Sequence, residues 1–330
     1  MVRLSEDSKY GFAIGRVRAL EPTLMDRPRY ERFVRARGGE EFAAALAETA
    51  YGKFLEGGAA GVARALEGAA KENSTFFSAC ALDEWLVRLF SMPAAFRVMK
   101  AAVKGALSQG GSDITLPEEL VALPERPIIA KVVGDVLQAF SRDRNPAAVD
   151  AAVDRLQQQV ERQVASASEF VAGYFALHAD TENLRTLVRV KARENDDKVL
   201  AGEMETAFLE GGALTLASLL SALPQPWEAI LGLLAKAPPN GVGSEEFREY
   251  LEQGRAALTD RRSFLRMERL GRELELGYLR LTRYATFGHE PLVAFFLLRE
   301  NELRNLRLLY AAKLAGLGVE QTQDLVAYVE

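Results

Sequence analysis

The sequence predicts an all-α protein built from diverged internal repeats. Apolar residues recur at spacings of three and four almost everywhere, which is the periodicity of amphipathic helices. Long alternating runs of β-branched and aromatic residues are missing, so no strand is expected. Two short strings also occur twice at distant positions, which indicates repetition of a larger helical unit.

Composition excludes several classes of protein. With 330 residues and 48% hydrophobic content, the chain can bury a sizeable core. A formal charge of −5 disfavours nucleic acid as a general partner, because binding to a phosphate backbone needs a positive field. The single cysteine, Cys80, rules out an internal disulfide, and neither a signal peptide nor a membrane-spanning run is recognisable. We therefore expect a soluble cytoplasmic protein, with Cys80 as a small buried thiol.

Helix starts are predicted from local chemistry. Asn145 followed by Pro146 is typical of an N-cap with proline at the first helical position. Another helix is expected to open in the same way at His289, Glu290 and Pro291. Asp180 is expected to cap or charge-stabilise a third helix start.

Two segments are predicted to be connectors, because glycine, proline and small polar residues interrupt the periodicity there. The first covers residues 108–127. The second covers residues 237–243, with Ser244 placed to cap the next helix. Either could be a domain seam or a long loop between helices.

A helix is expected from about Asp260 onward, with one apolar stripe and packing on one side only. Seven Arg and three Glu between residues 261 and 283 give this segment a net charge of +4. The charge suits either a solvated face or a contact with an acidic partner or lipid head groups. The stripe consists of Met267, Leu270, Leu274, Tyr278 and Leu281.

The clearest repeat pairs residues 183–191 (NLRTLVRVK) with residues 305–313 (NLRLLYAAK), which share five of nine residues. Both copies follow an aromatic-rich helix and acidic residues, so we interpret the unit as a helix pair. The string FLEGG at residues 54–58 and 208–212 is predicted to end a helix, with glycine in the left-handed C-cap conformation. A third copy of the helix pair is suggested by residues 85–90 and 95–100. The predicted division is into three helical repeats, at residues 1–107, 108–200 and 201–330.

No catalytic or cofactor-binding motif is recognisable. A phosphate-binding loop, a dinucleotide fingerprint and a nucleophile elbow are all missing from the sequence. His178, His289 and Cys80 are too widely separated to form a metal site. His178 lies near Asp180, as a general base beside a carboxylate would, but a polar residue at a helix junction explains it better. We expect no cofactor and no enzymatic activity.

Three strings resemble the C subunit of V-type and A-type ATP synthases, whose eukaryotic counterpart is the d subunit of V-ATPases. They are residues 10–21 (YGFAIGRVRALE), 291–307 (PLVAFFLLRENELRNLR) and 313–317 (KLAGL). The resemblance implies three pseudo-repeats arranged as a funnel with a central recess. It also implies a non-catalytic central-stalk connector on the cytoplasmic face of the membrane. The recess would receive the rotor shaft made of the D and F subunits, the base would contact the membrane proteolipid ring, and torque would pass between them for ion transport.

The matched repeat positions are the candidate contacts with the shaft. The alternative is that the two asparagines cap or bridge helices and the basic residues pair with carboxylates of their own repeat. The coupled ion, the direction of operation and the surface that meets the ring stay open. A rival function is a helical-repeat adaptor that binds peptides or proteins in its groove, although two copies so far apart favour a few large units. The candidate residues are Asn183, Arg185, Lys191, Asn305, Arg307 and Lys313.

Overall fold

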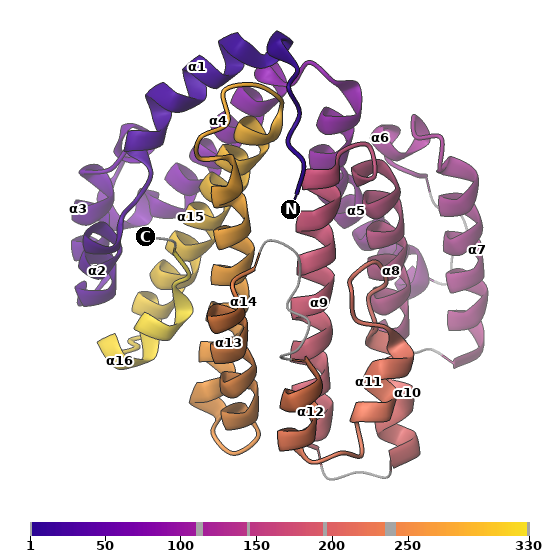
Figure 1. Cartoon of the computed structure of the whole chain (residues 1–330). Helices are drawn as coiled ribbons and strands as arrows, with labels where there is room; N and C mark the ends of the chain where they lie inside the picture. The colour runs from indigo at the N-terminus through magenta and orange to yellow at the C-terminus, as the bar shows by residue number, and fades with distance from the viewer. Residues whose placement is uncertain (1, 110–114, 144–145, 194–196, 235–241, 329–330) are drawn as a thin grey trace.

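In the computed structural model, residues 2–109, 115–143, 146–193, 197–234 and 242–328 are described, and every regular element in them is a helix (Figure 1). The prediction of an all-α protein is confirmed. Short 3-10 turns join several of the α-helices. The α-helices are α1 (Gly11–Leu20), α2 (Arg27–Arg35), α3 (Gly39–Ala47), α4 (Val62–Cys80), α5 (Glu84–Gln109), α6 (Glu118–Val121), α7 (Arg126–Asp143), α8 (Pro146–Ala165), α9 (Glu169–Lys191), α10 (Asp197–Ala207), α11 (Leu216–Ala222), α12 (Trp227–Leu234), α13 (Ser244–Ala257), α14 (Arg261–Leu279), α15 (Glu290–Leu314) and α16 (Val319–Thr322).

The repeated unit is one long helix and not a helix pair. The aromatic-rich segment and the NLR string that follows it belong to a single unbroken helix in both copies, α9 and α15. Both halves of the suggested third copy likewise lie in one helix, α5. The helix-pair interpretation was wrong because it took polar residues for a junction.

Asp180 shows why the junction was misplaced. It lies in the middle of α9 and is buried, so it caps no helix start. Its two carboxylate oxygens accept hydrogen bonds from the backbone N–H groups of Ala213 and Leu214, each at 2.9 Å. A distant segment therefore satisfies a side chain that looked like a local cap.

Two other predicted helix starts agree with the structure, but the cap predicted at Ser244 was wrong: α13 begins at Ser244 itself, and Gly243 is its N-cap. The helix α8 begins at Pro146, although Asn145 lies outside the described residues, and α15 begins at Glu290 with Pro291 in its first turn. Gly57 and Gly211 have the predicted left-handed φ angles, 79° and 101°, but neither is a C-cap, because the preceding helices already end at Phe54 and Ala207. Most of the second connector, residues 237–241, and residues 110–114 of the first also lie outside the described residues.

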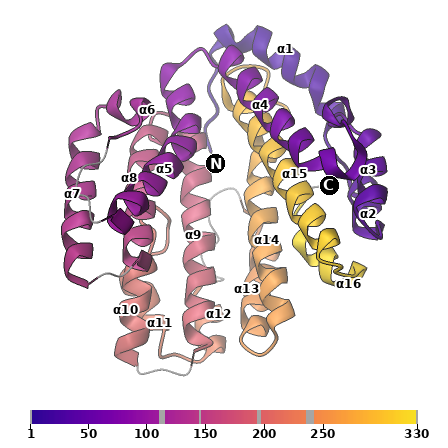
Figure 2. The same ribbon diagram turned by 180° about the vertical axis from the view of Figure 1, so that it is seen from behind.

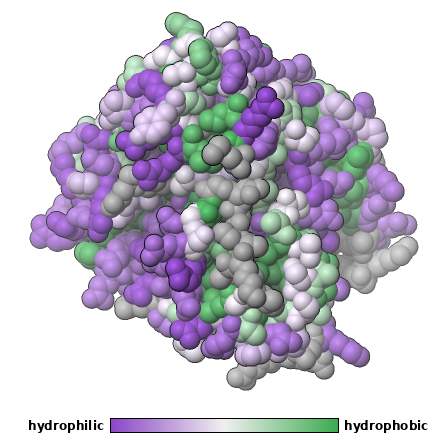
Figure 3. Space-filling model, viewed as in Figure 1, coloured by the Kyte–Doolittle hydropathy of each residue, from purple (hydrophilic) through white to green (hydrophobic). Residues whose placement is uncertain are grey.

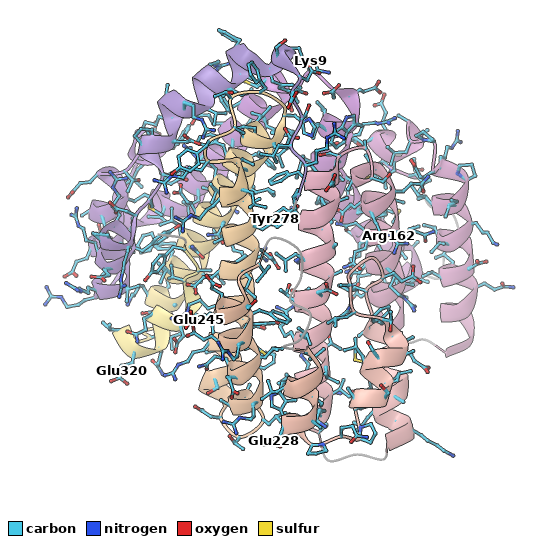
Figure 4. The ribbon with its side chains drawn as sticks, viewed as in Figure 1. Lys9, Arg162, Glu228, Glu245, Tyr278 and Glu320 are labelled. Atoms are coloured by element: carbon cyan, nitrogen blue, oxygen red, sulfur yellow. The ribbon has the colours of Figure 1, made fainter. Side chains whose placement is uncertain are left out.

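The helix α14 buries more than one face, so the prediction that it packs on one side only was wrong. Met267 and Tyr278 of the predicted stripe are buried, but so are Glu275 and Leu276, which lie off it. Leu281 is 42% exposed because it lies beyond the end of α14. The buried faces meet α13, α9 and α15. Tyr278 lies where α14 faces α9 and donates a 3.0 Å hydrogen bond to the carbonyl of Phe170 (Figure 4).

The long helices organise the molecule. From behind, α5 and α15 flank α9 and α14 (Figure 2). The helix α5 packs against α6, α7 and α8, while α9 packs against α8, α10, α13 and α14, and α15 packs against α1, α3 and α4. Each long helix is thus the centre of its own group of shorter helices.

Three hydrophobic clusters form the core. One joins α5, α7 and α8 to the N-terminal halves of α9 and α15, through residues such as Phe96 and Phe170. A second joins α2, α3 and α4 to the C-terminal half of α15 around Leu306, and a third joins α10 to α14 with the C-terminal half of α9 around Tyr250. Because these clusters combine distant parts of the chain, the division at residues 1–107, 108–200 and 201–330 stays a prediction.

The surface follows the same amphipathic pattern. On the face seen in Figure 3, hydrophilic residues cover most of the surface, and hydrophobic residues form smaller groups among them. Such a distribution is expected when each helix turns its apolar stripe inward and its polar face to water.

Candidate functional site

The two copies of the repeat place an acidic residue at the same point of their long helices. Asp180 of α9 and Glu302 of α15 lie three residues before the matched asparagines, and both are nearly completely buried. Asp180 accepts from two backbone N–H groups, and Glu302 accepts from the backbone N–H of Met25 and the hydroxyl of Tyr51. Burial raises the pKa of both carboxyl groups. In each copy, the acid ties the long helix to a segment distant in sequence.

The matched asparagines also have equivalent contacts. The side chain of Asn183 donates a hydrogen bond to the carbonyl of Leu209 and accepts another from the backbone N–H of Leu209, both of 2.8 Å. Asn305 donates to the carbonyl of Ala327 at 2.7 Å. Both side chains are fully buried. Each asparagine therefore bridges its helix to a returning backbone segment, as the alternative interpretation expected.

The matched lysines bind backbone carbonyls near the C-terminal ends of other helices. Lys191 donates to the carbonyls of Leu223 and Gln225, at 2.7 and 2.8 Å, just beyond α11. Lys313 donates to the carbonyl of Val34 in the last turn of α2, at 2.6 Å. The positive charge is favourable there because carbonyls at a helix end carry partial negative charge. Burial lowers the pKa of Lys313.

The matched arginines differ from each other. Arg185 pairs with Glu182 on its own helix and, at 3.4 Å, with Glu268 on α14. Arg307 makes a 3.4 Å hydrogen bond to the carbonyl of Leu66 and lines a large recess between the long helices. Of the six candidate residues, Arg307 is the one that lines this recess. Contact of any of the six with a partner stays a prediction.

The recess has a volume of about 800 Å³ and lies where α4, α5, α8, α9, α14 and α15 meet. We call it the central recess. Its apolar lining includes Leu89 and Phe90 of α5, Phe175 of α9, and Phe296 and Leu297 of α15. All three long helices thus contribute to its wall.

The wall of the central recess also carries several charged side chains. Arg162 of α8, labelled in Figure 4, forms a 3.1 Å ion pair with Glu210, and both residues line the recess. The other arginines are Arg97, Arg272, Arg304 and Arg307, and the other carboxylates are Asp154, Glu161 and Glu300.

A buried ionic cluster supports the wall between α9 and α14. Glu275 is only 2% exposed, and one of its carboxylate oxygens lies 2.9 Å from Nδ1 of His178. The same oxygen accepts a 2.8 Å hydrogen bond from the hydroxyl of Thr181, and the other accepts a 2.6 Å bond from Arg272. Burial opposes ionisation, but the charges of Arg272 and His178 dominate and hold the pKa of Glu275 at about 2.

His178 and Glu161 both line the central recess and both have raised pKa values. Burial lowers the pKa of His178, but the charge of Glu275 outweighs it and raises that pKa above 6.5. Burial raises the pKa of Glu161 to about 7, although Gln157 donates a 2.7 Å hydrogen bond to it.

Sequence reasoning missed the partner of His178. It considered Asp180 as a partner and preferred a polar residue at a helix junction, but the structure pairs this histidine with Glu275, 97 residues away. One signal was available, because Glu275 stands between Leu274 and Leu276 in an otherwise apolar stretch. A carboxylate in such a stretch needs a buried partner.

Comparison with known families identifies the kind of protein that carries this recess. Residues 13–325 match a sequence profile described as ATP synthase (C/AC39) subunit. The chain belongs to this family. It is thus a member of the C/AC39 subunits of V-type and A-type ATPases, as the sequence resemblance predicted.

Two further findings accompany the family assignment. No curated protein sequence matches the chain. Within the described ranges, none of the helices combines the length and the apolar content that crossing a bilayer requires.

Proposed function

We propose that this chain is the non-catalytic central-stalk connector of a V-type or A-type rotary ATPase. One end of the rotor shaft, made of the D and F subunits, enters the central recess, and the opposite surface rests on the proteolipid ring. The chain would lie peripherally on the cytoplasmic face of the membrane and transmit torque during ATP hydrolysis or synthesis.

Family membership carries this proposal, and the central recess supports it. A torque-transmitting connector needs a concave surface built from stiff elements, because the load must pass without the socket deforming. The wall of the recess includes residues of α5, α9 and α15, which are 26, 23 and 25 residues long. Hydrogen bonds from the buried residues Asn183 and Asn305 fix two of these helices to neighbouring segments.

The test first measures assembly of the chain with the shaft and then measures whether ATP hydrolysis drives ion pumping. The chain is co-expressed with the D and F subunits of the same organism, and size-exclusion chromatography should show a one-to-one complex with the shaft. In reconstituted vesicles, omitting the chain should abolish ATP-driven ion pumping while leaving ATP hydrolysis by the catalytic head. If the folded chain does not bind the shaft, or if pumping proceeds without it, the connector function is wrong. Binding to unrelated peptides instead would favour an adaptor.

A further inference from the structure

The charges in the central recess are unevenly paired. Every carboxylate in its wall has a cationic or amide partner within 3.1 Å. Three of its five arginines, by contrast, have no carboxylate oxygen within 4.0 Å among the described residues: these are Arg97, Arg304 and Arg307. The carboxylate pairs are Asp154 with Lys100 (2.8 Å), Glu161 with Gln157 (2.7 Å), Glu210 with Arg162 (3.1 Å) and Glu300 with Asn73 (2.8 Å).

The three arginines stand on two walls of the recess. Arg97 is on α5, and Arg304 and Arg307 are three residues apart on α15, so these two share a face of their helix. All three residues are exposed to solvent overall, although the charged group of Arg304 is partly buried. Arg272 contributes further positive charge close to Arg304. Burial lowers the pKa of Arg304, and repulsion from the charge of Arg272 lowers it further.

We propose that the central recess binds a protein segment that carries several carboxylates, and that Arg97, Arg304 and Arg307 are its anchoring residues. The proposal rests on the connector function and adds the chemistry of contact: the shaft end that enters the recess is acidic. Guanidinium groups bind carboxylates in a bidentate geometry, and arginines on two walls would hold the segment in one orientation.

Two features favour an acidic protein segment over a small phosphate ligand. Phosphate sites usually present free backbone N–H groups at a helix N-terminus. The arginines of the recess lie instead within α5 and α15, where backbone N–H groups are used by the helix itself. Apolar side chains in the same wall, such as Phe90 and Phe296, also suit the aliphatic parts of a peptide.

The test measures binding of the D–F complex to the isolated full-length chain by calorimetry at 50 and 300 mM salt. The triple variant Arg97→Glu, Arg304→Glu, Arg307→Glu should bind about 10- to 100-fold more weakly than the wild type. The matched control, Arg64→Glu, Arg126→Glu, Arg248→Glu, makes the same charge change at exposed arginines outside the recess and should bind normally. Affinity of the wild type should fall with salt more steeply than that of the triple variant.

The outcomes separate this proposal from the connector function. If the triple variant binds the shaft as tightly as the control, the acidic-segment proposal fails while the connector function stands. If the wild type does not bind the shaft, both fail. If inorganic triphosphate binds the free chain at micromolar concentration and the triple variant loses that binding, the recess is a small-anion site and the proposal is overturned. A triple Arg→Gln variant provides the same test should the Glu variant fail to fold.

Discussion

Asn183 and Asn305 occupy matched positions in α9 and α15, and each binds the backbone of a segment that returns to its own helix. The partner of Asn183 is Leu209, 26 residues downstream, and the partner of Asn305 is Ala327, 22 residues downstream. The shared NLR string therefore encodes a shared architecture. The acids and lysines at matched positions also make similar contacts in the two copies, whereas the matched arginines do not.

Replacing Asn183 should destabilise the fold more than replacing Asn305. Asn183→Ala breaks two hydrogen bonds and leaves both backbone groups of Leu209 unpaired, so we expect a loss of about 2–4 kcal/mol in the free energy of unfolding. Asn305→Ala breaks one bond and should cost about 1–3 kcal/mol. Urea denaturation measures both. Lys71→Ala, at an exposed position, should change stability by less than about 0.5 kcal/mol, and an equally small effect at Asn183 would contradict the bridging role.

The sequence was sufficient to predict the helical class and to match the two copies of the repeat in α9 and α15. Periodicity predicts helices reliably, and the left-handed glycines of the FLEGG strings followed from local chemistry. The continuity of α9 could not be predicted, because His178, Asp180 and Thr181 look like residues of a helix end. Their partners lie between 33 and 97 residues away, and only the tertiary structure brings them together.

The central recess was expected from a family resemblance, and its chemistry was only partly visible in the sequence. Arg307 was singled out because it belongs to the repeat. Arg97 and Arg304 were not singled out as partner contacts, because charged residues on a helix usually form a solvated face. Which arginines lack a carboxylate depends on where every acid folds to, and that is a property of the packed structure.

Lys313 should matter more for stability than Lys191. Lys313→Met keeps the length of the side chain but removes a buried, charge-assisted hydrogen bond to Val34, with an expected loss of about 1–3 kcal/mol. Lys191→Met should cost less, about 1 kcal/mol, because part of its contact with the end of α11 is exposed to water. Urea unfolding distinguishes the two, with Lys71→Met as an exposed control. A larger loss from Lys191→Met would show that the end of α11 needs its lysine more than the end of α2 does.

The two histidines should titrate on opposite sides of pH 6.5. The charge of Glu275 raises the pKa of His178, whereas burial lowers that of His289. Nuclear magnetic resonance can follow both, since the chain contains only these two. In Glu275→Gln the attraction is lost and burial dominates, so the pKa of His178 should fall below 6.5 while that of His289 stays in place. An unchanged His178 would mean that Glu275 does not set its ionisation.

Glu275 should make the stability of the fold sensitive to acid. Its folded pKa of about 2 lies below the ordinary value of 4.5, so its contribution to stability is complete above pH 4.5 and is lost as pH falls through 2. The contribution is on the order of 3 kcal/mol, which follows from linkage between the two pKa values. Between pH 6 and pH 2, the wild type should therefore lose more stability than Glu275→Gln. Parallel losses in the two proteins, measured by urea unfolding, would assign acid sensitivity to other groups.

Glu161 should have the opposite effect on stability. Its folded pKa of about 7 lies above 4.5, so folding is favoured when this carboxyl group is protonated. The stability that protonation provides is complete below pH 4.5 and is lost as pH rises through 7. Glu161→Gln mimics the protonated form and can still accept the hydrogen bond from Gln157.

At pH 8.5, Glu161→Gln should be more stable than the wild type by about 1–3 kcal/mol, whereas the two should unfold alike at pH 4.5. Glu245→Gln, at an exposed position of α13, should match the wild type at both pH values. Urea unfolding at the two pH values measures the difference. Because burial of Glu161 is the cause of its raised pKa, a wild type as stable as Glu161→Gln at pH 8.5 would show that water reaches this carboxylate within the central recess.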